Sequence, residues 1–339
     1  MLTSNATSTA TGSLFGLAYG DALGKATEFL RVPAIVARYG PGGPRDLEGT
    51  PALVTDDTQM ALAVAHALHN TDEFTPQALE PLLRDGFVAW SRSPDNNRAP
   101  GATCMGACGR LARGGRWQQA TAVHSKGCGA NMRVTPVGLV ASLDLDEVAG
   151  IAQFQAALTH GHPTALAAAE LTAYAIRMLR DGADLADLPG LLHERCSSQR
   201  RRYHHAWLGD LWSVARSRSP EAFIATGWDE CAAAVGRLRD ALVAPDASAD
   251  PCQATGAGWI AEEALATGLY CALMFPDKPV VALARAATTS GDSDSIACLT
   301  GAFIGAAAGM DAWPSGWSER IEYAEQLAHL GAAWDGVSP

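Results

Sequence analysis

Apolar positions along the chain recur with the spacing of α-helices. Between positions 58 and 68 they return every three or four residues, as one face of a helix requires. The same spacing predicts helices over 166–179, 260–273 and 280–287. Alternation of β-branched and polar residues, the mark of half-buried strands, is scarce, while alanine and leucine, strong helix formers, dominate. The pattern therefore predicts an all-α protein.

Two series of glycines are spaced by four residues. One series occupies positions 12, 16, 20 and 24, and the other occupies 301, 305 and 309. Glycine inside a helix costs about 1 kcal/mol relative to alanine, so something must offset it, and close approach of another helix is the plain explanation. We therefore expect the first and last helical regions to be central and tightly packed. This favours one compact domain over residues 1–339, with residues 1–10 as a flexible tail.

Segments rich in glycine, proline and aspartate interrupt the helical pattern. We predict loops over 40–50, 91–101 and 244–256. The longest apolar stretch, 296–310, spans about 15 residues, fewer than the roughly 20 that a membrane helix needs. The first ten residues lack the basic region of a signal peptide. We expect a cytoplasmic protein without a membrane segment.

Carboxylates gather in two short clusters, 54–58 (Val-Thr-Asp-Asp-Thr) and 291–295 (Gly-Asp-Ser-Asp-Ser), each just before a predicted helix. Residues two apart on a helix point about 200° from each other, so such pairs converge only where a loop turns into a helix. Ser, Thr and Asp also cap helices, which explains either cluster taken alone. Two carboxylates per cluster, flanked by hydroxyls, exceed what capping needs.

The second interpretation of these clusters is a metal site. Their side chains offer only oxygen atoms, which select Mg²⁺, Mn²⁺ or Ca²⁺ over Zn²⁺ or copper. Four aspartates converging without cations would repel each other strongly. Two divalent ions would balance them, and paired metals are an established hydrolytic device.

Charge and cysteine usage exclude several other classes. The 339-residue chain is 48% hydrophobic and 18% charged, with a net charge of −11, so it suits a folded protein that does not bind nucleic acid non-specifically. The basic and aromatic run 200–205 is interpreted as a solvated helix face. The eight cysteines form no C-x-x-C pair, which favours reduced thiols over a zinc site. The oligomeric state stays open, with a monomer favoured.

Five motifs occur in the order of a known family and span nearly the whole chain. They are Gly16–Gly24 followed by Glu28-Phe29, then Thr55–Thr58, Ser125–Arg133, Thr159-His160 and Gly291–Ala297. In these motifs the chain resembles the ADP-ribosylglycohydrolases. A single motif would be weak evidence, and five in order are strong evidence.

The resemblance implies an all-α fold with a binuclear magnesium centre in a cleft, with Mn²⁺ as an alternative ion. It implies a metal-dependent hydrolase that cleaves the N- or O-glycosidic bond between ADP-ribose and an acceptor. The implied metal ligands are Thr55, Asp56, Asp57, Asp292, Asp294 and Ser295. The implied substrate contacts are Glu28, Gly101, Thr103, Ser125, Gly127, Cys128, Gly129, Met132 and His160.

Asp57 and Glu28 are the candidate catalytic groups. We favour Asp57 as ligand and base, and assign Glu28 to a flap that gates the site. Asp21, on the first glycine-rich segment, is interpreted as a buried structural carboxylate and not a ligand. Trp259 is expected to pack in the core or to line a pocket.

Two positions depart from the family pattern and leave alternatives open. Ser295 replaces a frequent threonine and keeps an oxygen ligand, whereas Cys128 replaces an asparagine found in some relatives and changes a substrate contact. The acceptor, whether arginine, serine, a nucleic-acid end or a metabolite, therefore stays open. The alternatives to this enzyme are an inactive metal- or ADP-ribose-binding or structural member of the family, and a two-metal hydrolase of another glycoside or a phosphoester.

Overall fold

The computed structural model describes residues 8–336, and over this range the chain is all-α, as predicted. Only four isolated β-bridges occur there, and they join loops and helix ends without forming a strand. The helices are α1 (Thr9–Lys25), α2 (Val32–Tyr39), α3 (Asp56–His69), α4 (Pro76–Arg92), α5 (Ala102–Leu111), α6 (Trp117–Ala120), α7 (Thr135–Leu139), α8 (Leu145–Ala157), α9 (Pro163–Arg180), α10 (Leu188–Gln199), α11 (His205–Leu208), α12 (Leu211–Val214), α13 (Pro220–Val243), α14 (Cys252–Thr255), α15 (Ala261–Met274), α16 (Pro279–Ala286), α17 (Ser293–Ala308) and α18 (Ala324–Asp335), with short 3₁₀ turns η1 (Cys128–Ala130), η2 (Leu185–Asp187) and η3 (Met310–Ala312).

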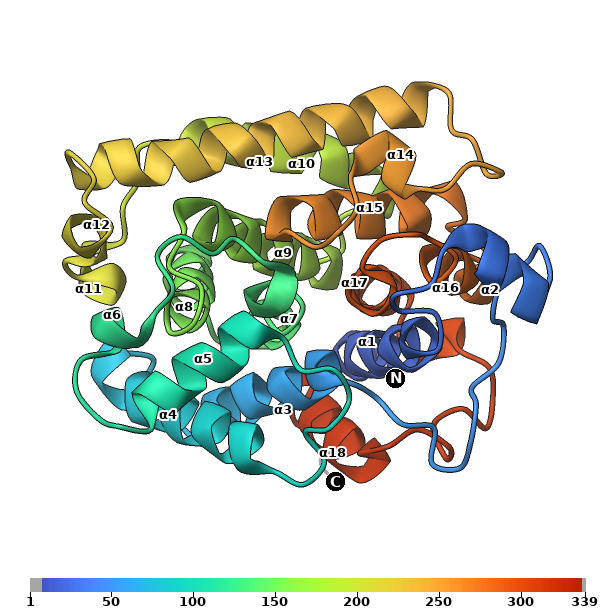
Figure 1. Ribbon diagram of the computed structural model, residues 1–339, viewed down its shortest axis with the longest axis horizontal. Coiled ribbons are helices and arrows are strands. Elements are labelled where there is room, and N and C mark those ends of the chain that lie inside the picture. The colour runs from blue at the N-terminus through green and yellow to red at the C-terminus, as the bar shows by residue number, and fades with distance from the viewer. Residues whose placement is uncertain (1–7, 337–339) are drawn as a thin grey trace, which may run out of the picture.

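Helices α1 and α17, from opposite ends of the chain, pack together at the centre of the molecule (Figure 1). A Cβ atom added at any glycine of the first series would overlap backbone atoms of α17 or of Gly309, its C-cap. Conversely, a Cβ at Gly301 or Gly305 would overlap the backbone of α1. The predicted close approach of the two glycine-faced helices is thus confirmed.

The last helix completes the contact between the chain ends. The carboxylate of Asp335, at the end of α18, accepts hydrogen bonds from the backbone N–H groups of Ala10 and Thr11 and from the Thr11 hydroxyl. It therefore caps the start of α1, where Ser8 makes no side-chain capping bond. Of the tail expected over residues 1–10, residues 1–7 lie outside the described part, whereas Thr9 and Ala10 are buried in α1.

The remaining helices surround this pair. Helix α9 packs against α8 and α13, and α13 runs the length of one side of the molecule (Figure 1). Helix α3 packs against α4, which in turn packs against α5. The core lies between these elements and contains buried side chains from almost every helix.

The predicted helices all exist, and their ends differ from prediction by a few residues. The loop expected over 244–256 contains one helical turn, α14, and α4 covers the first two residues of the loop expected over 91–101. The predicted helix face at 200–205 is wrong, because this segment connects α10 to α11 and only His205 is helical. Its Arg200 and Arg202 pair with Asp229 and Asp146 instead.

Among the described residues, no helix combines the length and hydropathy that crossing a bilayer requires. All eight cysteines are free thiols, and seven of them are buried.

Candidate metal centre and cleft

The first acidic cluster lies where the chain enters α3. Thr55 is the N-cap of this helix, and its hydroxyl accepts a hydrogen bond from the backbone N–H of Asp57 at 3.4 Å. Asp56 and Asp57 follow in the first turn, and both are buried. The capping interpretation therefore holds for Thr55 and leaves the two carboxylates unexplained.

The second cluster lies where the chain enters α17. Asp292 is the N-cap residue, yet its side chain makes no capping hydrogen bond. Asp294 and Ser295 follow in the first turn, and all three side chains are buried. Asp294 Oδ1 accepts a hydrogen bond from the backbone N–H of Ser295 at 2.9 Å, so capping accounts for one oxygen of this cluster and leaves the others to face the α3 cluster.

Glu28 joins the carboxylates from a third direction. It lies just beyond the end of α1, and oxygen atoms of Glu28, Asp292 and Asp294 lie within 4.8 Å of one another. The Ser293 hydroxyl donates to the carbonyl of Gly24 at 3.0 Å, which ties the start of α17 to the end of α1. The close contact of the two glycine-faced helices therefore sets where Glu28 lies.

The electrostatics of this group are unfavourable without cations. Burial, followed by the charge of Asp294, raises the pKa of Glu28 to about 9. Burial is also the main reason that the pKa of Asp56 rises to about 7, and burial together with Asp294 raises the pKa values of Asp57 and Asp292 well above the ordinary value. Unless positive charge is supplied, Glu28 therefore keeps its proton at neutral pH and Asp56 keeps it part of the time.

The donor atoms fit hard divalent cations. Asp57 Oδ1 is buried and has no hydrogen-bond partner, a costly state that a cation would relieve. The Thr55 hydroxyl lies 3.2 Å from Asp57 Oδ2 and 3.5 Å from Asp294 Oδ2, so it joins the two clusters. The group offers carboxylate and hydroxyl oxygens only, the set preferred by Mg²⁺ and Mn²⁺.

These residues form the floor of a cleft of about 340 Å³. Of the residues predicted for metal and substrate, those lining it are Glu28, Asp56, Asp57, Gly101, Thr103, Gly127, Cys128, Gly129, Met132, His160, Asp292, Asp294 and Ser295. Thr55 lies behind this lining. Ser125 lies outside it and contacts Thr103 through a hydroxyl–hydroxyl bond of 3.1 Å. The structure thus brings together residues far apart in the sequence, whose individual roles stay predictions.

A chain of hydrogen bonds behind the cleft reaches His160. The buried guanidinium of Arg133, which can only donate, bonds the Thr159 hydroxyl at 2.8 Å. That hydroxyl lies 2.9 Å from His160 Nδ1, and if it donates its own proton there, the ring carries its hydrogen on Nε2. Burial lowers the pKa of His160 to about 3, so the ring is neutral. Nε2 lies beside Gly127 and Gly129, where this tautomer would offer the cleft a hydrogen-bond donor.

Two aromatic rings stand at the rim of the cleft. Phe29 and Trp259 are stacked, with centroids 5.8 Å apart and planes 16° apart, and they are 66% and 42% exposed. Phe29 has a φ of 62°, a left-handed conformation that is rare for an aromatic residue. Trp259 was expected in the core or in a pocket, and it lines this one. No spacing in the sequence indicates the contact of Trp259 with Phe29, because the two residues lie 230 positions apart.

Asp21 is fully buried and hydrogen-bonded, as predicted. Arg133 entered the prediction only as the last residue of the motif Ser125–Arg133, and its hydrogen bond to Thr159 was not expected. No lysine or arginine is among the described residues that line the cleft, and no pattern in the sequence indicated this.

Comparison with known proteins agrees with this architecture. The family model described as ADP-ribosylglycohydrolase matches residues 2–337. The ADP-ribosyl-[dinitrogen reductase] glycohydrolase of Rhodospirillum rubrum is 25% identical over 317 residues, covering 92% of this chain and 90% of that protein. An ADP-ribosylarginine hydrolase of Pseudomonas putida is 25% identical over 330 residues, covering 95% and 76%.

A solved structure and a partial match complete the comparison. A structure titled ADP-ribosylglycohydrolase-related protein complex covers 98% of this chain and 99% of its own, with a TM-score of 0.67 at 24% identity, and so shares the fold. An uncharacterised protein of Archaeoglobus fulgidus is 34% identical over 169 residues, and this match spans about half of that protein's length (53%).

Proposed function

Since the chain belongs to the ADP-ribosylglycohydrolase family of enzymes, we propose that it removes ADP-ribose from arginine side chains in a reaction that requires two divalent cations, Mg²⁺ or Mn²⁺. The observation that carries the proposal is the convergence of Glu28, Asp57 and Asp294 on one cleft floor from three separate segments. A structural or binding protein of the same fold has no need for such a costly group of buried carboxylates.

Both acidic clusters would contribute ligands to the cations. Thr55, Asp56 and Asp57 would hold them from α3, and Asp292, Asp294 and Ser295 from α17. When bound, the cations would supply positive charge at the ribose and lower the pKa of a nearby water molecule. Glu28 belongs with this group as well, because its carboxylate lies beside those of Asp292 and Asp294.

Asp57 and Glu28 are the groups that move protons in this proposal. Asp57 Oδ1 has no hydrogen-bond partner, so it is available to accept a proton from the attacking water. Glu28 lies beside Asp292 and Asp294 and would donate a proton to the leaving nitrogen as the anomeric carbon gains oxocarbenium character. The neutral His160 would orient ADP-ribose by donating from Nε2 to a phosphate or ribose oxygen.

The rim of the cleft supports arginine as the acceptor. A guanidinium is planar and cationic, and it is stabilised by stacking on aromatic faces and by nearby carboxylates. Phe29 and Trp259 offer such faces beside Glu28. An acceptor with phosphates of its own would find no lysine or arginine among the described residues that line the cleft. The Pseudomonas putida relative is itself named for ADP-ribosylarginine.

The direct test is release of ADP-ribose from ADP-ribosyl-arginine, ADP-ribosyl-serine peptide and O-acetyl-ADP-ribose, with and without Mg²⁺. We expect release from the arginine conjugate, abolished by EDTA and by Asp294→Ala. Release from the serine or acetyl conjugate alone would overturn the acceptor and leave the hydrolase. Hydrolysis of p-nitrophenyl phosphate without release from any conjugate would favour a phosphoesterase instead.

A further inference from the structure

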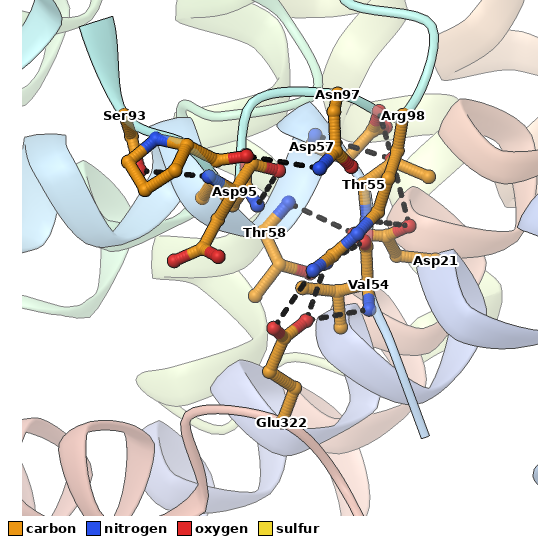
Figure 2. Close-up of polar contacts among 12 residues, drawn as sticks. Asp21, Val54, Thr55, Asp57, Thr58, Ser93, Asp95, Asn97, Arg98 and Glu322 are labelled. Carbon is orange, nitrogen blue, oxygen red and sulfur yellow. Dashed lines mark hydrogen bonds and ion pairs between the residues drawn. The ribbon is translucent and has the colours of Figure 1, made fainter. Parts of the chain in front are cut away.

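The segment 54–58, which carries the first acidic cluster, is held from two sides by three charged side chains outside both clusters (Figure 2). These are Asp21 of α1, Arg98 of the loop before α5, and Glu322 of the loop before α18. We propose that the three are positioning residues, which fix this segment in the shape that binds cations. The inference rests on the metal centre proposed above.

Asp21 holds the segment from the core side. Its Oδ1 accepts from the backbone N–H of Thr55 at 2.9 Å and from the Thr55 hydroxyl at 2.8 Å. Its Oδ2 accepts from the backbone N–H of Thr58 at 3.0 Å and from the Thr58 hydroxyl at 2.5 Å. One carboxylate thus satisfies four donors in the segment, two of them backbone groups at the start of α3.

The bond to the Thr55 hydroxyl has a directional consequence. A hydroxyl has one proton and two lone pairs. Asp21 Oδ1 is the nearest acceptor at 2.8 Å, ahead of Asp57 Oδ2 at 3.2 Å and Asp294 Oδ2 at 3.5 Å. The proton therefore points into the core, one lone pair accepts the backbone N–H of Asp57 at 3.4 Å, and the other is left for the two acidic clusters. Asp21 in this way makes the Thr55 oxygen an electron-pair donor at the site.

Arg98 and Glu322 hold the segment from the other side. Arg98 Nη1 donates to the carbonyl of Val54 at 2.6 Å, and Glu322 Oε2 accepts from the backbone N–H of Val54 at 3.0 Å. The two side chains also form a two-pronged ion pair at 2.5 and 3.0 Å, only 13% and 14% exposed. Both polar backbone groups of the residue before Thr55 are thus fixed.

The same arginine links the metal segment to the wall of the cleft. Arg98 belongs to the loop that continues into Gly101, whose N–H donates to Asp56 Oδ2 at 3.1 Å. The loop is itself braced by internal bonds, including Asn97 Nδ2 to the carbonyl of Pro94 at 2.9 Å (Figure 2). Loosening the Arg98–Glu322 pair should therefore disturb the acidic cluster and the cleft wall together.

The test is Mn²⁺ binding to the full-length metal-free protein, measured by calorimetry at a temperature where each variant is folded by circular dichroism. We expect Asp21→Asn, which replaces an acceptor with an amide donor facing other donors, to weaken binding about 10- to 100-fold, the usual effect of losing a partner of a ligand. Glu322→Gln and Arg98→Lys should weaken it about tenfold or less, because a hydrogen bond remains.

The chain offers matched controls. Asp335→Asn changes a carboxylate that, like Asp21, accepts several hydrogen bonds at the start of a helix. Its three bonds come from the start of α1, at the opposite end of that helix from the acidic clusters. Glu80→Gln and Arg84→Lys change an ion pair of similar exposure, 21% and 18%, whose arginine also donates to backbone carbonyls, at Leu111 and Gly115. These controls should lower stability without changing Mn²⁺ affinity.

The measurements distinguish failure of the positioning role from failure of the proposed metal centre. Unchanged Mn²⁺ affinity in folded Asp21→Asn and Glu322→Gln, with lower stability alone, would overturn the positioning role. If Asp21→Asn does not fold, the Glu322→Gln and Arg98→Lys affinities decide. Absence of Mn²⁺ binding by the unaltered protein would instead overturn the metal centre itself, and the inference with it.

Discussion

The cleft contains two kinds of polar residue that differ in how completely their bonding is specified. Thr159 and Arg133 hold His160 through a chain of hydrogen bonds. Asp57 is buried, and its Oδ1 has no hydrogen-bond partner in the protein. The first kind is held by protein groups alone, whereas the second needs cations before it can be stable in ionised form.

The Thr159 hydroxyl is expected to control ligand affinity without touching the ligand. Thr159→Val removes the group that directs a proton to His160 Nδ1, so the ring loses its preference for presenting Nε2–H to the cleft. We expect ADP-ribose to bind about tenfold more weakly, equal to the loss of one hydrogen bond. Calorimetry with ADP-ribose would measure this. Thr172→Val, at a buried hydroxyl without a partner on α9, should bind normally, and equal weakening in both variants would contradict the role of Thr159.

The two candidate proton-transfer groups can be distinguished by substitution and pH. Asp57→Asn should lower kcat by about 100-fold or more at every pH, because both a ligand and a base are removed. Glu28→Gln should lower kcat less and should abolish the decline of activity on the alkaline side, because that decline reports loss of the Glu28 proton. A pH–rate profile of Glu28→Gln with an unchanged alkaline limb would show that Glu28 only gates the cleft.

At the scale of elements, the glycine faces of α1 and α17 decide the geometry of the site. The two helices approach so closely that side chains are excluded between them, and Glu28 and Asp294 stand at one end of this contact. Burying backbone against backbone leaves little freedom for sliding, so the acidic groups are held at fixed separations. The conformational cost of glycine in both helices is offset by this packing.

Replacing glycine by alanine should therefore lower the stability of the protein at a position in α1 and raise it at a position in α13. Gly16→Ala would place its methyl group on the backbone of Gly301 and should lower the free energy of unfolding by about 1–3 kcal/mol or more. Gly236→Ala, inside α13 with open space around it, should raise stability by about 0.5–1 kcal/mol. Urea unfolding of both variants measures this, and a neutral Gly16→Ala would contradict the close packing.

The sequence predicted where helices lie better than it predicted which residues they contact. The four-residue glycine spacing predicted a close helix contact, and the Asp-rich junctions predicted where α3 and α17 begin. No local pattern indicated that Asp335 caps α1, that Arg98 and Glu322 hold Val54, or that Phe29 stacks on Trp259, because these contacts depend on how distant segments meet. Helix α13, the longest element, was not predicted either, since its apolar positions are diluted by polar ones.

At the scale of the whole molecule, the buried carboxylates link stability to pH and to cations. Without metal, the folded protein keeps a proton on Glu28 and part of one on Asp56 at neutral pH, with pKa values of about 9 and 7, whereas the unfolded chain has already released both. Unfolding then releases protons, so rising pH favours the unfolded state. The stability present at low pH is lost as pH rises towards these pKa values.

We therefore expect the metal-free protein to melt several degrees lower at pH 8 than at pH 7. Saturating Mg²⁺ or Mn²⁺ should raise the melting temperature at both pH values, and more at pH 8, because cations bind the ionised carboxylates. Differential scanning calorimetry in EDTA and in excess metal provides the comparison. A metal-free melting temperature that rises between pH 7 and 8 would contradict the raised pKa values.

The pairing of α1 with α17 and α18 also limits when the protein can complete its fold during translation. A ribosome releases α1 well before its partner helix and the carboxylate that caps it, which are translated more than 250 residues later. Until then the glycine face of α1 lacks the backbone of α17, and Glu28 lacks Asp292 and Asp294. The nascent chain can therefore complete its centre and its cleft only after α17 and α18 have emerged.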